Sequence, residues 1–205
     1  MASVVKIGSP DHTQRIRQVQ VFIIVWMLVE VVVSLFSAWR ARSPALFAFG
    51  GGSVIELASA ALVLWRFRSG SAYETKESRA ARIAGALLFV LTACVVIVSA
   101  LSLVGYGEPK PSVTGIVILL LAAVVMPLLA REKCKLSTVT GSAALRADAA
   151  ESAICAYLSA VALLGVGINT IWHILWADPV AAVVIVPFII WEGREAMRGK
   201  ACGCY

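Results

Sequence analysis

The chain has 205 residues, of which 60% are hydrophobic and only 15% are charged, and its mean hydropathy is +0.88. An ordinary soluble domain is about 45–50% apolar and about 25% charged. This composition therefore excludes a disordered chain, a collagen-like fibre and a small disulfide scaffold, and it argues strongly against a soluble enzyme. We expect a membrane protein, in which the net charge of +6 must first be interpreted through membrane topology.

A membrane-spanning helix needs about 20 mostly apolar residues. Six stretches meet this requirement, and in chain order they are residues 19–39, 45–65, 83–104, 112–130, 143–168 and 172–191. Polar connections are expected at 66–82 and 131–140, and a minimal break at 169–171. The predicted fold is an all-α bundle of six transmembrane helices. It divides the chain into an N-terminal segment 1–18, a transmembrane domain 19–192 and a short tail 193–205.

The basic residues predict an orientation for this bundle. If the N-terminus and the even-numbered connections face the cytoplasm, 15 of the 18 Lys and Arg residues lie on that side, including Lys133 in the connection 131–140. Only Arg40, Arg42 and Lys110 lie on the other side. This asymmetry is the positive-inside pattern, so we expect both termini in the cytoplasm, the lipid bilayer as partner and no nucleic-acid binding.

Four carboxylic acids fall inside the predicted spans, namely Glu30, Glu56, Asp148 and Glu151. Ionisable groups at this depth are costly and mark ion pathways or proton relays by default. Since no Lys or Arg is predicted at a similar depth, the acids are expected either to be protonated or to hold a cation.

The fifth span places several polar groups on one face. At about 100° per residue, Asp148, Glu151 and Cys155 lie within roughly 60° of one another. Ser53 and Glu56 form the facing stripe on the second span, and Glu30 lies at a similar depth on the first. Carboxylates and a thiolate at one level predict a site for a divalent ion of the zinc type.

Other interpretations of the same residues stay open. Glu56 and Glu151 are alternatively protonated acids bonded to serine, and Cys155 is alternatively a small apolar core residue. Glu30 alternatively has a structural role and does not bind the metal. Asp148 alternatively lines an access path or starts a helix. In the tail, Cys202 and Cys204 form a Cys-x-Cys that either captures a soft metal, with Cys134 as a third thiolate, or stays reduced and solvated.

Three stretches together resemble the cation diffusion facilitator family. Residues 147–155 read ADAAESAIC and resemble the fifth-helix signature of that family, in which Ala-Asp-Ala is followed after one residue by His-x-x-x-Asp. Residues 53–66 resemble its second helix, and residues 176–182, WADPVAA, resemble the start of its sixth helix. By position, the resemblance makes Glu56, Glu151 and Cys155 metal ligands. Gly52 stands where the family has its first second-helix ligand, so Asp148, Glu30, Ser53 or water must complete the set.

The resemblance implies a function, a partner and a location. The family exports divalent metal, usually zinc, in exchange for protons and usually as a homodimer, so we expect a multi-pass metal/proton antiporter of the plasma membrane. The metal is cargo, and no cofactor and no enzymatic activity are expected. The family's cytoplasmic metal-binding domain has no counterpart in residues 193–205. A transport-inactive membrane scaffold or regulator is the main alternative, and a redox protein that uses the Cys-x-Cys tail is the third.

Overall fold

The computed structural model describes residues 10–69, 74–140 and 143–198. Within these ranges all regular structure is helical, with six α-helices and no strand. The helices are α1 (Pro10–Ala41), α2 (Pro44–Ser69), α3 (Glu74–Leu103), α4 (Val113–Thr140), α5 (Ala143–Trp172) and α6 (Ala177–Arg198). The all-α architecture predicted from the sequence is thus confirmed.

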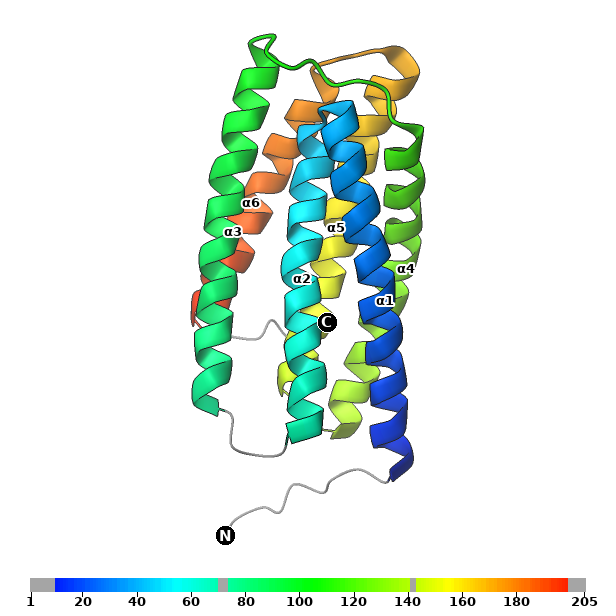
Figure 1. Cartoon of the computed structure of the whole chain (residues 1–205), viewed down its shortest axis with the longest axis vertical. Coiled ribbons are helices and arrows are strands. Elements are labelled where there is room, and N and C mark those ends of the chain that lie inside the picture. Colours follow the sequence, from blue (N-terminus) through cyan, green and yellow to red (C-terminus); the bar gives the residue numbers. More distant parts are fainter. Residues whose placement is uncertain (1–9, 70–73, 141–142, 199–205) are drawn as a thin grey trace.

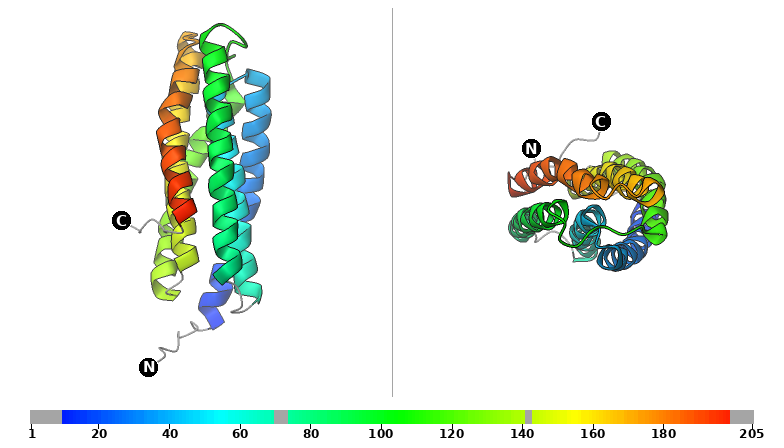
Figure 2. Two further views of the ribbon diagram at one scale, coloured as in Figure 1. Left: turned by 90° about the vertical axis from the view of Figure 1, so that its left-hand side faces the viewer. Right: turned by 90° about the horizontal axis from the view of Figure 1, so that it is seen from above.

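The helices run alternately up and down and form two layers (Figures 1 and 2). One layer contains α1, α2 and α3, and the other contains α4, α5 and α6. Across the layers α1 contacts α4, α2 contacts α5, and α3 contacts α6. Because α2 and α5 are the central helices of their layers, side chains on their facing sides are covered by neighbours in every direction.

Four of the helices are long and apolar enough to cross a membrane, judged over the described residues. The apolar segments are Val21–Ala41 in α1, Ala86–Leu103 in α3, Val113–Val139 in α4 and Glu151–Trp172 in α5, and α2 adds the shorter Pro44–Ala58. Large apolar side chains such as Val32 and Phe36 remain exposed on the outside of the bundle. Hydrocarbon suits such a surface better than water does. The chain therefore has the character of a multi-pass membrane protein, while the count of six spans and the orientation stay predictions.

The helices extend beyond the apolar runs that predicted them. α3 begins at Glu74 instead of residue 83, and α4 continues to Thr140 through the stretch predicted as a polar connection. The predicted break at 169–171 is helical, and the turn lies at 173–176. Likewise α1 begins inside the segment 1–18, and α6 continues into 193–205. Hydropathy marks only the part of a helix that suits hydrocarbon, whereas Arg, Glu, Lys and Leu continue a helix readily.

Asp178, at the start of α6, ties one end of the bundle together. Its Oδ1 accepts a hydrogen bond of 3.0 Å from the backbone N–H of Ala45, and its Oδ2 accepts one of 2.5 Å from Ser43 Oγ. The first N–H groups of a helix have no partner within the helix and favour a negative charge. The Asp178 carboxyl therefore caps α2 from the opposite layer and fixes the two layers to each other at this end.

Gly165 allows α5 and α6 to approach closely. A Cβ atom added at Gly165 would lie 2.3 Å from the Cβ of Ala181 and 3.1 Å from the carbonyl oxygen of Ala177. Small residues at helix contacts are the usual way in which membrane helices gain packing energy. Gly167, two residues further along α5, has open space at the same position.

We predict that Gly165→Ala lowers the stability of the bundle, because the new methyl group overlaps α6. The cost of such overpacking is about 1–3 kcal/mol, and thermal unfolding in detergent followed by circular dichroism measures it. Gly167→Ala is the matched control, which should be neutral or slightly stabilising because alanine favours a helix by about 1 kcal/mol. Equal melting temperatures for the two variants would contradict the close α5–α6 contact.

Candidate functional site

A buried polar stripe runs along the inner face of α5. Asp148, Ser152, Cys155 and Ser159 are all buried, and their spacing places them on one side of the helix. Glu151 lies at the edge of this stripe and is only half-buried. The polar face that the sequence predicts on the fifth span is therefore present, and it faces α2 and α4 between the layers.

Lys133 on α4 corrects the prediction that no basic residue lies at the depth of the acids. Its side chain is fully buried, within the apolar segment Val113–Val139. The prediction was wrong because residues 131–140 continue α4 as a helix, which turns Lys133 inward with its buried neighbours. Those neighbours, Met126, Leu129, Ala130, Leu136 and Ser137, recur at helical spacing. That recurrence is the sequence signal that could have placed Lys133 inside the bundle.

The ammonium of Lys133 is surrounded by oxygen atoms. Its Nζ lies 3.0 Å from Asp148 Oδ1 and 3.8 Å from Glu56 Oε1, and it donates a 2.6 Å hydrogen bond to Ser152 Oγ. It also lies 3.4 Å from the backbone carbonyl oxygen of Asp148. We call these four residues, Glu56, Lys133, Asp148 and Ser152, the lysine cluster. Such a cluster compensates buried charge, because an ion removed from water needs both an opposite charge and hydrogen bonds.

Glu56 is the part of the lysine cluster contributed by α2. Its Oε1 accepts a 2.5 Å hydrogen bond from Ser152 Oγ, whereas its Oε2 has no hydrogen-bond partner within the described residues. Only 4% of the residue is exposed. Glu192 on α6, which sequence reasoning missed, is half-buried and close enough to Glu56 to interact with it electrostatically. Glu56 thus retains one buried oxygen that can take a proton or a cation.

A second group of polar residues surrounds Glu30 on α1. Ser53 Oγ donates a 2.6 Å hydrogen bond to Glu30 Oε1, and Trp26 Nε1 donates one of 3.0 Å to Glu30 Oε2. The thiol of Cys155 lies 3.9 Å from both Glu30 Oε1 and Ser53 Oγ. We call Trp26, Glu30, Ser53 and Cys155 the Glu30 cluster. Trp26 is a member that sequence reasoning treated only as part of the apolar first span.

The two clusters form one path through the bundle. Cys155, a member of the Glu30 cluster, also interacts with Glu56, and Ser152 and Asp148 lie on the same face of α5 toward its N-terminus. The seven helical steps from Asp148 to Cys155 cover about 10 Å of helix. Polar side chains therefore lead from the middle of α1 toward the end of the bundle at which α5 begins, within a surrounding of apolar side chains.

The structure does not present a finished metal site in the part of the chain that it describes. No three His, Cys, Asp or Glu side chains there are grouped so that they could hold a metal ion. The predicted ligand set of Glu56, Glu151 and Cys155 therefore stays a prediction. Gly52 lacks a side-chain ligand but not the room for one, since an added Cβ would meet only Leu158, at 3.9 Å.

The cysteine predictions have a mixed outcome. Cys202 and Cys204 lie outside the described residues, so their metal-binding role stays a prediction. Cys134 on α4 is disulfide-bonded, which corrects the expectation of a reduced thiol at this position. A sulfur atom in a disulfide is not a thiolate, and the hypothesis that Cys134 supplies a third thiolate ligand does not apply in this state.

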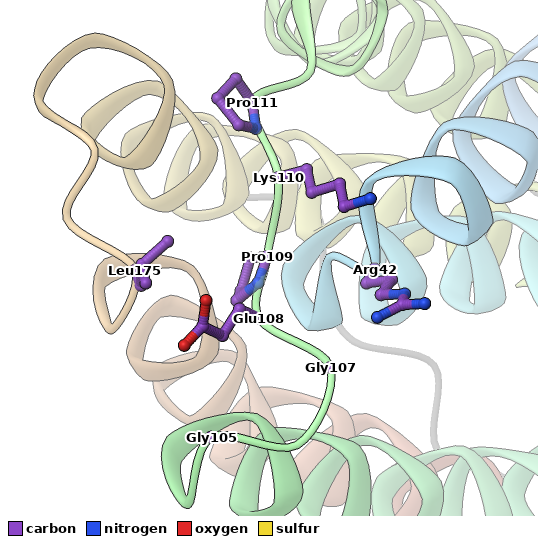
Figure 3. Close-up of a pocket in the computed structure, with 8 residues that line it drawn as sticks. All are labelled: Arg42, Gly105, Gly107, Glu108, Pro109, Lys110, Pro111 and Leu175. Atoms are coloured by element: carbon purple, nitrogen blue, oxygen red, sulfur yellow. The ribbon is translucent and has the colours of Figure 1, made fainter.

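An open pocket lies at the end of the bundle where α1 turns into α2 (Figure 3). It has a volume of about 430 Å³ and is lined by Arg42, Gly105, Gly107, Glu108, Pro109, Lys110, Pro111 and Leu175. None of the predicted site residues lines it. The backbone N–H of Lys110 is held by the carbonyl of Ala41 at 2.7 Å, so this loop packs on the α1–α2 turn and is separate from the two clusters.

We predict that Lys133 and Asp148 are energetically coupled. Asp148→Asn should destabilise the protein by about 3 kcal/mol, because the ammonium loses a buried partner. In Lys133→Met/Asp148→Asn both charges are absent, so the loss should be smaller than the sum of the two single losses. Thermal unfolding of Asp148→Asn, Lys133→Met and the double variant in detergent measures the coupling. If the two single losses of stability add up to the loss of the double variant within about 0.5 kcal/mol, the ion pair is contradicted.

No protein-family model matches the chain, and no curated protein matches it either. The resemblance to cation diffusion facilitators therefore rests on the residues of the second, fifth and sixth helices alone. The lysine cluster and the Glu30 cluster provide the structural evidence for a function.

Proposed function

We propose that the chain is a membrane transporter that exchanges a divalent cation, of the zinc type, for protons. The observation that carries this proposal is the buried path of polar side chains from Glu30 and Ser53 through the Cys155 thiol to Glu56, Ser152, Lys133 and Asp148, on α1, α2, α4 and α5. Such a path inside an apolar bundle is expensive to build, and in membrane proteins ionisable groups of this kind mark ion and proton routes.

The chemistry of the path supports cation exchange. Glu56 offers a buried oxygen without a hydrogen-bond partner, and Asp148 and Glu30 add carboxyls on two other helices. Carboxylates bind a metal only when deprotonated, so metal and protons compete for them. In the predicted orientation, the Asp148 end faces the cytoplasm. A cation would then be taken up there and released on the opposite side, where protons replace it.

The transport cycle requires the two layers to move relative to each other. The path lies between the layers, since Glu30 and Glu56 belong to one layer and Lys133 and Asp148 to the other. A tilt of one layer would separate these groups and expose them to one side at a time. The hydrogen bonds of Asp178 to Ser43 and Ala45 hold the other end of the bundle together, so we propose that these bonds open when the cation is released on that side.

A transport-inactive scaffold or regulator is the second candidate. Two observations favour it: Lys133 already neutralises acids of the path, and no three metal-binding side chains are grouped in the described residues. In that case the lysine cluster would serve only to hold α2, α4 and α5 in register.

Reconstituted transport tests the proposal. We expect purified protein in liposomes loaded with a zinc-sensitive dye to move Zn²⁺ when an opposing proton gradient is imposed. Collapse of the gradient by an ionophore should slow the flux. Glu56→Gln should reduce the initial rate by about tenfold or more, since it removes a charged oxygen ligand.

Glu108→Gln is the matched control, because Glu108 is an exposed acid outside the path. It should transport at the wild-type rate. A Glu56→Gln variant that also transports at the wild-type rate would refute the role of the path. A wild-type protein that moves no divalent cation, with or without a gradient, would favour the scaffold.

A further inference from the structure

Lys133 occupies the position that a transported cation would need. Its Nζ lies within 3.8 Å of carboxylate oxygens of both Glu56 and Asp148, and Ser152 Oγ and a backbone carbonyl complete an oxygen shell around it. Carboxylates, a hydroxyl and a carbonyl are also the oxygen ligands that divalent cations use. The cluster is therefore a cation site that already contains a cation, supplied by the chain itself.

We infer that Lys133 is a tethered competitor of the transported ion. In the cation-free protein its ammonium holds Glu56 and Asp148, and a divalent cation can bind these carboxylates only by displacing it. This inference rests on the proposed function, because it describes how the same site is regulated. Lys133 is then an inhibitory element, and the ligand set predicted from the sequence does not include it.

Electrostatics explains why the two cations exclude each other. A divalent ion bound to Glu56 and Asp148 would lie within a few ångströms of the ammonium, and like charges at that separation in a water-poor interior repel strongly. The Lys133 ammonium can move away from the two carboxylates, because it is carried on a long flexible side chain. The carboxylates would in turn remain neutralised at every stage, first by Lys133 and then by the metal, which avoids the cost of uncompensated buried charge.

The effect of removing Lys133 on metal binding distinguishes a competitor from a permanent structural ion pair. A permanent pair holds α4 to α5 and is indifferent to metal, so its removal weakens the fold without improving metal binding. A competitor occupies ligand atoms, so its removal leaves Glu56 Oε1 and Asp148 Oδ1 without a competing cation. The sign of the change in metal affinity therefore distinguishes the two roles.

Equilibrium binding of Zn²⁺ to the purified full chain in detergent, at one fixed pH, tests the inference. Lys133→Met should bind Zn²⁺ about tenfold more tightly than the wild type, or better, as a coupling of typical size requires. Lys135→Met is the matched control on the same helix, because Lys135 is 72% exposed and pairs only with Glu132 among the described residues. The Zn²⁺ affinity of Lys135→Met should equal that of the wild type. Any Zn²⁺ binding by Cys202 and Cys204 is common to all variants and does not affect the comparison.

A second comparison covers the case in which Lys133→Met does not fold. Lys133→Gln keeps a donor for Ser152 without the charge and should also bind Zn²⁺ more tightly. The pair Asp148→Asn and Lys133→Met/Asp148→Asn repeats the comparison with one carboxylate fewer. Circular dichroism and size-exclusion chromatography establish that each variant is folded.

The outcomes separate the inference from the proposed function. Folded Lys133 variants that bind Zn²⁺ no better than their lysine-containing counterparts overturn the inference, and a wild type that transports keeps the proposed function. If the wild type does not bind but Lys133→Met does, the competitor role is supported and transport by the wild type is overturned. Absence of binding in every variant overturns both.

Discussion

The ion pair between Lys133 and Asp148, extended by Ser152 to Glu56, is the interaction on which the centre of the bundle depends. It connects α4, α5 and α2 with distances of 3.0 Å for the ion pair and 2.5–2.6 Å for the two serine hydrogen bonds. A lysine, an aspartate and a glutamate in an apolar interior would each be costly alone. Together they allow the helices to carry charge where hydrocarbon surrounds them, and each constrains the position of the others.

The sequence predicted the architecture well because membrane helices have a strong signal. Long apolar runs identified all six helices. The helical spacing of Asp148, Glu151 and Cys155 predicted the inner face of α5, on which Asp148 and Cys155 are buried and Glu151 is half-buried at the edge. The prediction failed at Lys133, since hydropathy assigned a basic residue near the end of an apolar run to the aqueous rim. In the structure α4 continues to Thr140, and the contacts of Lys133 with α5 show that this lysine turns inward. The hydrogen bond from Trp26 to Glu30 was also beyond prediction, because it depends on side-chain direction and not on the apolar character of the first span.

This correction changes the chemistry of the site. The sequence suggested several acids without a basic partner, a situation that calls for protons or a metal. In the structure the acids differ from one another: Asp148 and Glu56 share Lys133, whereas Glu30 is held by neutral donors, Ser53 and Trp26. A cation that entered from the Asp148 end, as proposed, would thus meet a charge-compensated region first and an acid with neutral partners deeper in the bundle. Exchange of one cation for another at the first region is consistent with the proposed antiport, and permanent occupancy by Lys133 is consistent with a scaffold.

Amine labelling of the unmodified protein in membranes tests whether the Lys133 ammonium is buried. Reductive methylation followed by mass spectrometry compares Lys133 with Lys135, two residues away on the same helix and 72% exposed. We expect Lys135 to be methylated while Lys133 stays unmodified, because the Nζ of Lys133 is enclosed by Asp148, Glu56 and Ser152. Methylation of both lysines at the same rate would contradict this expectation and would return Lys133 to the aqueous rim.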